Sequence, residues 1–277
     1  MSLAVVLGGG GSAALGWHTG VLAGLADARV ELPAAATLIG TSAGAIIAIR
    51  LATDPSAEHR LSQYRTVLSD PPARAPEADY AAVSHSWAEA VAGAGSAEQA
   101  RSRIGALALA ATTISPARRR QEIAELVPRT DWPATELRIT AVSAQTGRLR
   151  IFRAADGVAL LDAVGASCAV PGVWPPVWIG GEAYVDGAVR SPLNLSVAAG
   201  HQQVLVLAPM AGPAGLDREL AALTGAQQCV IAADAMASTA FGTNPLDPAV
   251  AAAAARAGYR QGSAAADEVR RLLSGAS

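Results

Sequence analysis

The sequence contains no lysine, so every basic residue other than histidine is an arginine. This absence excludes mechanisms that need a lysine, such as Schiff-base chemistry or phosphate binding by a P-loop. Cysteine is nearly absent too, because only Cys168 and Cys229 occur and they form no metal-spaced pair. We expect two buried thiols rather than a disulfide framework. The net charge is -2, which gives no electrostatic argument for a nucleic-acid partner.

Long hydrophobic runs are also missing. The N-terminus lacks the pattern of a signal peptide, and the apolar stretch 104–114 is too short to span a bilayer. The sequence therefore predicts a cytoplasmic protein, and peripheral contact with a membrane surface stays open. Hydrophobic residues make up 51% of the 277 residues, enough for a sizeable core. With no internal repeat and no linker, we expect a single domain over 1–277.

The order of the expected elements indicates an α/β fold. A buried strand at 3–7, a glycine run, a helix at about 17–28 and a second strand at 32–39 describe a parallel unit. Helical periodicity then dominates from 54 to 132, which we interpret as a helical insertion covering one side of the sheet, as a lid would. The remaining expected elements are strands at 137–142, 149–153, 183–187 and 203–208, and helices at 160–168, 216–241 and 247–273.

The pentapeptide Gly40-Thr41-Ser42-Ala43-Gly44 has the pattern G-x-S-x-G between a short apolar run and a possible buried helix. Small residues around Ser42 allow a sharp strand-to-helix turn that exposes the hydroxyl. The N-terminus of the helix would favour developing negative charge at that position. By itself the pattern also fits an ordinary turn in a chain rich in alanine and glycine.

The glycine run Gly8–Gly11 has three interpretations. A dinucleotide fold is suggested by Gly9-x-Gly11-x-x-Ala14, but the second strand ends without the acidic residue that would hold a ribose. A P-loop needs Gly-Lys-Ser/Thr, which is absent. An oxyanion hole needs backbone N–H groups that approach the reacting carbonyl, and glycines beside an elbow serine supply them.

A serine nucleophile needs a base, and the residues leave two candidates. His201 follows a plausible acid in the α/β-hydrolase order, although it also resembles an exposed residue at a helix end. Asp186 ends an apolar strand and precedes Gly187, and burial there would raise its pKa and make it a better proton acceptor. Alone, Asp-Gly is also a simple turn signal.

Two further groups have more than one interpretation. Arg118, Arg119 and Arg120 form either a solvated helix face or a patch for phospholipid head groups, and we favour the solvated face. Trp174 and Trp178, shortly before Asp186, fit an acyl pocket, a lipid-contacting surface or plain core equally well.

Three motifs in order resemble those of the bacterial patatin-like phospholipases, which are acyl hydrolases with a Ser–Asp dyad. They are Val6–Gly11, Gly40–Gly44 and Asp186-Gly187-Ala188. The resemblance extends to 20–22 and 166–172, and it covers about 1–53 and 135–210. It implies a three-layer α/β/α fold with a mostly parallel sheet and no metal or organic cofactor.

The same resemblance implies hydrolysis of lipid acyl esters, of the phospholipase A or esterase type, through an acyl-enzyme. The implied partner is a lipid or acyl-ester substrate. The implied site residues are Ser42 as nucleophile, Asp186 as general base, Gly9, Gly10, Gly11 and Ala43 as the oxyanion hole, and Gly40 and Gly44 as the elbow.

The sequence departs from the family at one point, because no Arg or Lys follows the glycines between Gly11 and Gly16. Oxyanion stabilisation would then depend on backbone amides alone, and a neutral or small acyl ester fits as well as a phospholipid. Two alternatives remain: acyl transfer to an alcohol by the same dyad, and a catalytically weak patatin fold that acts as a binding protein.

Overall fold

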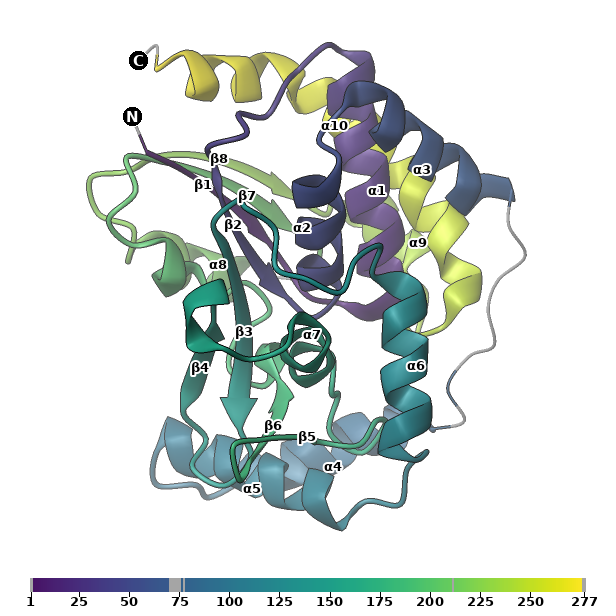
Figure 1. Ribbon diagram of the computed structural model, residues 1–277, viewed down its shortest axis with the longest axis vertical. Helices are drawn as coiled ribbons and strands as arrows, with labels where there is room; N and C mark the ends of the chain where they lie inside the picture. Colours follow the sequence, from purple (N-terminus) through teal and green to yellow (C-terminus); the bar gives the residue numbers. More distant parts are fainter. Residues whose placement is uncertain (1, 70–75, 77, 211, 276–277) are drawn as a thin grey trace.

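The computed structural model describes residues 2–69, 76, 78–210 and 212–275. Helices pack on both faces of one central sheet (Figure 1). The strands are β1 (Leu3–Leu7), β2 (Thr37–Thr41), β3 (Leu137–Ser143), β4 (Leu149–Phe152), β5 (Val177–Ile179), β6 (Glu182–Asp186), β7 (Gln203–Ala208) and β8 (Gln227–Ala232). The helices are α1 (Gly11–Asp27), α2 (Ala43–Thr53), α3 (Ala57–Ser69), α4 (Tyr80–Val91), α5 (Ala97–Ala110), α6 (Pro116–Leu126), α7 (Leu160–Ser167), α8 (Pro213–Leu220), α9 (Ala235–Ala240) and α10 (Ala251–Ser274), with short 3₁₀ turns between some of them.

The sheet is mostly parallel. Strands β8, β7, β1, β2 and β3 run side by side in the same direction, and β4, β5 and β6 add antiparallel pairs at the β3 end. Parallel strands need helical crossovers, and α1 supplies the connection from β1 to β2. The three-layer α/β/α architecture with a mostly parallel sheet is therefore confirmed.

Alternate residues of β1 belong to the two sides of the sheet. Leu3, Val5 and Leu7 join the larger core with residues of α1, α2, α7 and α10. Ala4 and Val6 join a smaller core on the other face, with α8 and the segment 193–198. All five β1 residues are buried, as a central strand of a covered parallel sheet requires.

Helices α1 and α10 pack unusually closely, because glycines recur every fourth residue where they meet. Gly16, Gly20 and Gly24 of α1 face α10, and Gly258 and Gly262 of α10 face α1. A Cβ atom added at Gly20 would lie 2.0 Å from the Ala255 carbonyl oxygen, well inside contact distance. The absent side chains therefore let the two backbones touch.

The helices between α2 and β3 do not form one cover over the sheet, contrary to our expectation for 54–132. Helix α3 packs on α1 and α10, α4 and α5 pack together at one end of the molecule, and α6 packs on α7 (Figure 1). The segment therefore divides among three places.

The predicted helix 216–241 is wrong. It contains α8, then β8, then α9. Strand β8 pairs in parallel with β7 from Gln203↔Gln227 to Ala208↔Ala232, and Gly225 with a φ of 78° precedes it in the turn. Pairing with β7 thus overrides the helical propensity of the flanking alanines. Two boundaries also differ: α1 begins at Gly11 rather than near Trp17, and β2 begins at Thr37 rather than Leu32.

Within the described ranges, no helix combines the length and apolar character needed to cross a bilayer.

We expect Gly20→Ala to lower the free energy of unfolding by about 1–3 kcal/mol, because the added methyl group forces α1 away from α10. Chemical denaturation followed by circular dichroism measures this change. Gly215→Ala is the matched control, since a Cβ at this exposed position of α8 meets nothing within 4 Å. That variant should match or exceed the wild type by up to about 1 kcal/mol. Equal destabilisation of the two variants would contradict the packing argument.

Candidate active site

The register of β3 brings the two motifs of the predicted dyad together. Thr41, the last residue of β2, pairs with Thr140, and Asp186, the last residue of β6, pairs with Ala141. Thr140 and Ala141 also pair with β4, so β4 occupies one edge of β3 while β2 and β6 share the other. The C-terminal ends of the parallel β2 and the antiparallel β6 therefore face each other. Ser42 directly follows the end of β2, and Asp186 is the last residue of β6.

Ser42 occupies a strained turn between β2 and α2. Its φ is 53° and its ψ is -121°, a conformation that residues with a side chain rarely adopt. The glycines on either side permit this turn: a Cβ at Gly40 would lie 2.4 Å from the Ala45 Cα, and one at Gly44 would lie 1.9 Å from the Leu7 carbonyl oxygen. The geometry is that of a nucleophile elbow.

A hydrogen bond fixes the elbow from the side of α7. The Ser42 backbone N–H donates to Ser167 Oγ at 2.8 Å, and both residues are buried. Ser42 is the N-cap of α2, so its hydroxyl lies at the end of this helix where the helix dipole favours negative charge.

The glycine loop lies directly beside this serine. A Cβ at Gly9 would be 3.2 Å from the Ser42 Cβ, so a side chain there would crowd Ser42. The N–H of Gly9, however, donates to the Pro192 carbonyl at 2.8 Å and is not free for an oxyanion. Among the described residues, the amides of Gly10, Gly11 and Ala43 donate to no acceptor. The Gly9 amide is thus occupied in this structure, and the other three amides are the candidate donors with a free N–H.

The carboxyl of Asp186 is 1% exposed, and its surroundings make it a stronger base than an ordinary aspartate. Burial raises its pKa to about 7, while the nearby Ser42 hydroxyl, the Ala188 N–H and the Arg119 guanidinium act in the opposite direction. Its Oδ1 accepts the Ala188 N–H at 2.8 Å. Its Oδ2 is buried without a hydrogen bond of standard geometry and is available to a proton.

Cys168 lies in the same neighbourhood but is not a competing nucleophile. Burial, together with the Asp186 charge, raises the pKa of its thiol to about 12. Cys168 therefore stays protonated at physiological pH, as expected for a buried structural thiol.

Asn194 holds the two ends of the site together. Its amide nitrogen lies 3.2 Å from Thr41 Oγ1, 3.3 Å from Thr140 Oγ1 and 3.2 Å from the Gly187 carbonyl oxygen. The same residue has a φ of 51°, and its Oδ1 accepts from Arg190 at 2.7 Å. One buried side chain thus bridges the strand before Ser42 and the turn after Asp186.

None of the four histidines, all within the described residues, forms a hydrogen bond with Ser42 or Asp186. His201 binds the Ala198 carbonyl through Nδ1 at 2.9 Å and belongs to another part of the molecule. His85 pairs with Glu89 on the surface of α4. His18 is buried behind the glycine loop; burial lowers its pKa to about 4, and its Nε2 lies 2.8 Å from the Gly8 carbonyl oxygen, to which it donates.

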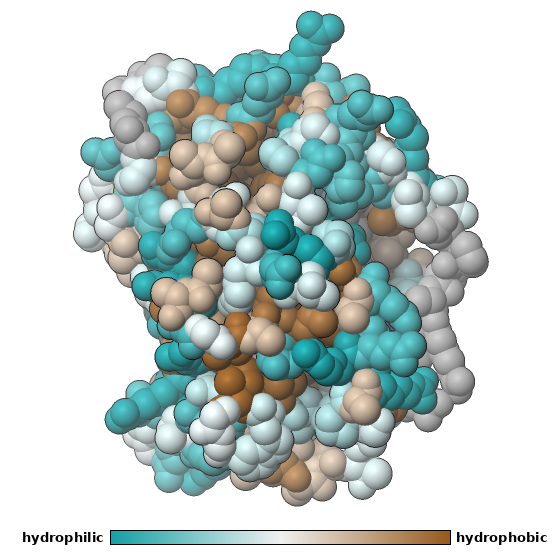
Figure 2. Space-filling model, in the orientation of Figure 1, coloured by the Kyte–Doolittle hydropathy of each residue, from teal (hydrophilic) through white to brown (hydrophobic). Residues whose placement is uncertain are grey.

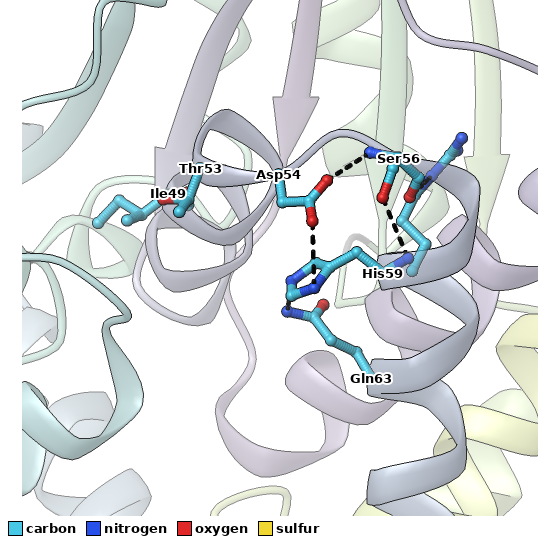
Figure 3. Close-up of polar contacts among 7 residues, drawn as sticks. Ile49, Thr53, Asp54, Ser56, His59 and Gln63 are labelled. Atoms are coloured by element: carbon cyan, nitrogen blue, oxygen red, sulfur yellow. Dashed lines mark hydrogen bonds and ion pairs between the residues drawn. The ribbon is translucent and has the colours of Figure 1, made fainter.

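The remaining histidine belongs to a Ser–His–Asp group that is not a catalytic triad (Figure 3). Asp54 Oδ2 lies 3.6 Å from His59 Nδ1, but Gln63 Nε2 is 2.8 Å from His59 Nε2 and donates to it. Ser56 Oγ accepts the backbone N–H of His59 at 3.2 Å. Since the ring nitrogen that would act as a base is occupied, the group stabilises the start of α3.

The arginine triplet on α6 is divided between solvent and interior, so the prediction of a solvated face fails for Arg119. Arg118 and Arg120 are exposed, whereas Arg119 is 9% exposed. The Arg119 Cζ stacks 3.9 Å from the centre of the Trp174 ring. Its Nη1 donates to Glu122 at 3.1 Å, and its Nε is buried without a partner.

The two tryptophans near Asp186 have different environments. Trp174 packs in an apolar cluster with Val170, Val173 and Leu246, and α4 adds Val83 and Trp87 to this cluster. Leu246 reaches the glycine loop, where a Cβ at Gly11 would lie 2.6 Å from its Cδ2. Trp178 on β5 is 61% exposed. Trp174 therefore lies in an apolar cluster next to the site, and Trp178 faces outward.

Three residues near the site, Ser167, Asn194 and His18, were not singled out from the sequence, and Arg119 was predicted to lie on a solvated face. Ser167 lies near the end of the expected helix 160–168, and Asn194 lies in the connection between two expected strands. Nothing in their local pattern distinguishes them. A buried His18 could have been found from its place in the apolar helix α1. Arg119 becomes distinct only through its contact with Trp174.

Comparison with known protein families gives a match. A model of the patatin-like phospholipases matches residues 5–199. A comparison with curated proteins gave no match. Similar solved structures include the type III effector ExoU, at 15% identity and a TM-score of 0.43 over 96% of this chain and 53% of that one. Another is VipD from Legionella pneumophila, at 13% identity and a TM-score of 0.46 over 96% and 67%.

A third similar structure is full-length ExoU from Pseudomonas aeruginosa in complex with SpcU, at 15% identity and a TM-score of 0.43 over 99% of this chain and 53% of that one. The chain thus spans about half to two thirds of the length of these proteins. The family match decides the family, because it extends over more than half of the chain and includes the glycine loop, the elbow and Asp186. The chain belongs to the patatin-like phospholipase family.

Proposed function

We propose that the chain is a serine hydrolase that cleaves carboxylic esters of lipids, with Ser42 as nucleophile and Asp186 as general base. The observation that carries this proposal is the head-to-head meeting of β2 and β6 on β3. It puts a strained serine beside a buried carboxyl whose pKa is raised to about 7. A base with a pKa near the working pH accepts a proton efficiently.

The reaction would proceed in two halves. Ser42 Oγ attacks the ester carbonyl carbon as its proton passes to Asp186 Oδ2, and the oxyanion forms near the amides of Gly10, Gly11 and Ala43. The tetrahedral intermediate collapses as Asp186 returns the proton to the leaving alcohol, which leaves an acyl group on Ser42. Water then attacks the acyl-enzyme as Asp186 accepts its proton. The second tetrahedral intermediate collapses as Asp186 returns that proton to Ser42 Oγ, which releases the acid and restores the enzyme.

Acyl transfer and binding without catalysis are the other outcomes of the tests. If an alcohol replaces water in the second half, the product is a new ester, which product analysis with an added acceptor alcohol detects. If the protein only binds lipids, a fluorophosphonate probe leaves Ser42 unlabelled. The cytoplasmic location and the single-domain organisation stay predictions.

We also propose that one end of the molecule touches lipid surfaces. Large hydrophobic side chains are exposed there on α4, α5 and β5: Val91, Leu107, Leu109 and Trp178. Figure 2 shows hydrophobic side chains gathered over the lower part of this face, where β5 and α7 lie in Figure 1. Contact at this end would bring a lipid ester toward the apolar cluster around Trp174.

Ser42→Ala should abolish hydrolysis of p-nitrophenyl esters of graded chain length, and Asp186→Asn should reduce kcat by about 10²–10⁴-fold because the isosteric amide accepts no proton. Release of nitrophenol measures both. His201→Ala is the control and should match the wild type, since this histidine is bonded to Ala198. Nitrophenol release by Ser42→Ala at the wild-type rate would overturn the proposal, and loss of activity in His201→Ala would indicate a triad instead.

The activity should rise with pH through about 7. Asp186 must be ionised to accept the serine proton, and burial raises its pKa to about 7. Below this value kcat/KM should fall about tenfold per pH unit. Cys168 does not contribute, because its pKa is raised to about 12. Initial rates with an uncharged ester between pH 4.5 and 9 measure the profile, and a rate that stays constant down to pH 5 contradicts the assignment of the base.

Trp178→Ala should weaken binding to phosphatidylcholine vesicles by roughly tenfold, because inserting a large apolar side chain contributes about 1.5–3 kcal/mol. Co-sedimentation measures the partition. Met236→Ala is the matched control: Met236 is 60% exposed, close to the 61% of Trp178, but it lies on α9, away from β5 (Figure 1). Equal effects of the two substitutions would argue against a defined lipid-contacting end.

A further inference from the structure

We propose that Arg119 is a specificity-determining residue of this site, which binds an anionic phosphate carried by the alcohol part of the ester substrate. The inference rests on the proposed hydrolysis at Ser42 and names the substrate class for it. Arg119 belongs to the helical insertion and to none of the three motifs that contain the proposed dyad and the glycine loop.

The first step is the position of the guanidinium. Arg119 stacks on Trp174, and Trp174 shares its apolar cluster with Val170 and Leu246. Leu246 contacts the glycine loop at Gly11, and Ala169, next to Val170, accepts the backbone N–H of Asp186 at 3.0 Å. The cluster therefore extends from the oxyanion loop to the base, with Arg119 at its border. The guanidinium is close enough to lower the pKa of both Asp186 and Cys168.

The second step is the set of donors that Arg119 leaves unused. Its Nη1 is bonded to Glu122, but Nε and Nη2 donate to no acceptor in the described part of the chain, and Nε is fully buried. These two groups form one edge of the planar guanidinium, the edge that binds two oxygens of a phosphate or carboxylate at once. A buried donor without a partner is costly, so an arriving oxyanion is favoured there.

The third step is the charge. Glu122 is shared, since its Oε1 lies 3.3 Å from Arg118 and its Oε2 lies 3.1 Å from Arg119. One carboxylate between two guanidiniums leaves positive charge uncompensated at Arg119. Arg120, by contrast, has its own partner in Asp162 at 3.0 Å. Stacking on Trp174 fixes the plane of the guanidinium, so the free edge has a defined direction.

The fourth step excludes a purely structural ion pair. A residue that only anchors α6 would saturate its donors with the protein, as Arg50 does when its Nε and Nη2 both donate to the Leu126 carbonyl. Arg119 leaves the equivalent edge empty. An ester whose alcohol part carries a phosphate has two oxygens for this edge and an acyl chain for the apolar cluster.

The test compares two short-chain esters that share an acyl group, 1-hexanoylglycerol and 1-hexanoylglycerol 3-phosphate. For Arg119→Gln, we expect the ratio of kcat/KM for the phosphate ester to that for the neutral ester to fall about tenfold or more, through KM. Arg119→Lys keeps the positive charge but lacks the two-donor edge of the guanidinium, so its ratio should lie between those of Arg119→Gln and the wild type. Arg120→Gln is the matched control, because it removes an exposed charge from the neighbouring position, and its ratio should stay within about twofold of the wild type.

An unchanged ratio in Arg119→Gln overturns the proposal, because a residue that acted only on Asp186 or on the fold would affect both esters alike. If Arg119→Gln does not fold by circular dichroism, the ratio in Arg119→Lys decides in the same way. If the wild type cleaves neither ester, the proposed function fails, and calorimetry tests Arg119 separately. The calorimetry compares binding of the phosphate ester to two variants, Ser42→Ala and Ser42→Ala/Arg119→Gln. Weaker binding to the double variant supports the assignment of Arg119, and equal binding to both overturns it.

Discussion

The site depends on one constraint: strands β2 and β6 both pair with β3, and they end opposite two consecutive residues of it. β2 ends at Thr41 opposite Thr140, and β6 ends at Asp186 opposite Ala141. Backbone ladders, rather than flexible side chains, therefore set the separation between the serine turn and the carboxyl. A slip of one residue in β6 would turn Asp186 to the other face of the sheet. The chemistry of the site thus depends on a register that the whole sheet maintains.

This rigidity allows the site to hold polar groups that are poorly satisfied. In the described part of the chain, four buried side-chain atoms lack a hydrogen-bond partner, among them Asp186 Oδ2, Arg119 Nε and His18 Nδ1. The first belongs to the proposed base, the second lies at the border of the apolar cluster around Trp174, and the third lies behind the glycine loop. Unsatisfied groups cost stability, and two of them, Asp186 Oδ2 and Arg119 Nε, belong to residues for which we propose a function. The same desolvation raises the pKa of Asp186.

The sequence predicted the features that local sterics impose and missed those that tertiary contacts decide. Gly40 and Gly44 were recognisable because only glycine fits where a Cβ would strike the backbone. Asp186 was recognisable as the end of an apolar strand before a glycine. Strand β8 was not, because its identity comes from pairing with β7 rather than from its own pattern. Arg119 could not be told from its solvated neighbours, since only the side of α6 that faces Trp174 in the fold distinguishes it from them.

The division between these two groups of residues follows the chain. The serine turn, the glycine loop and Asp186 belong to the sheet and its connections, where substitutions disturb the ladder. Arg119, Val83 and Trp87 come from the helices between α2 and β3, and they meet the segment after Cys168 mainly through side chains. Such contacts can change without moving the strands. In the proposed function, the sheet therefore holds the groups that attack the ester bond, and the insertion is the part of the molecule in which selectivity for the rest of the ester can vary.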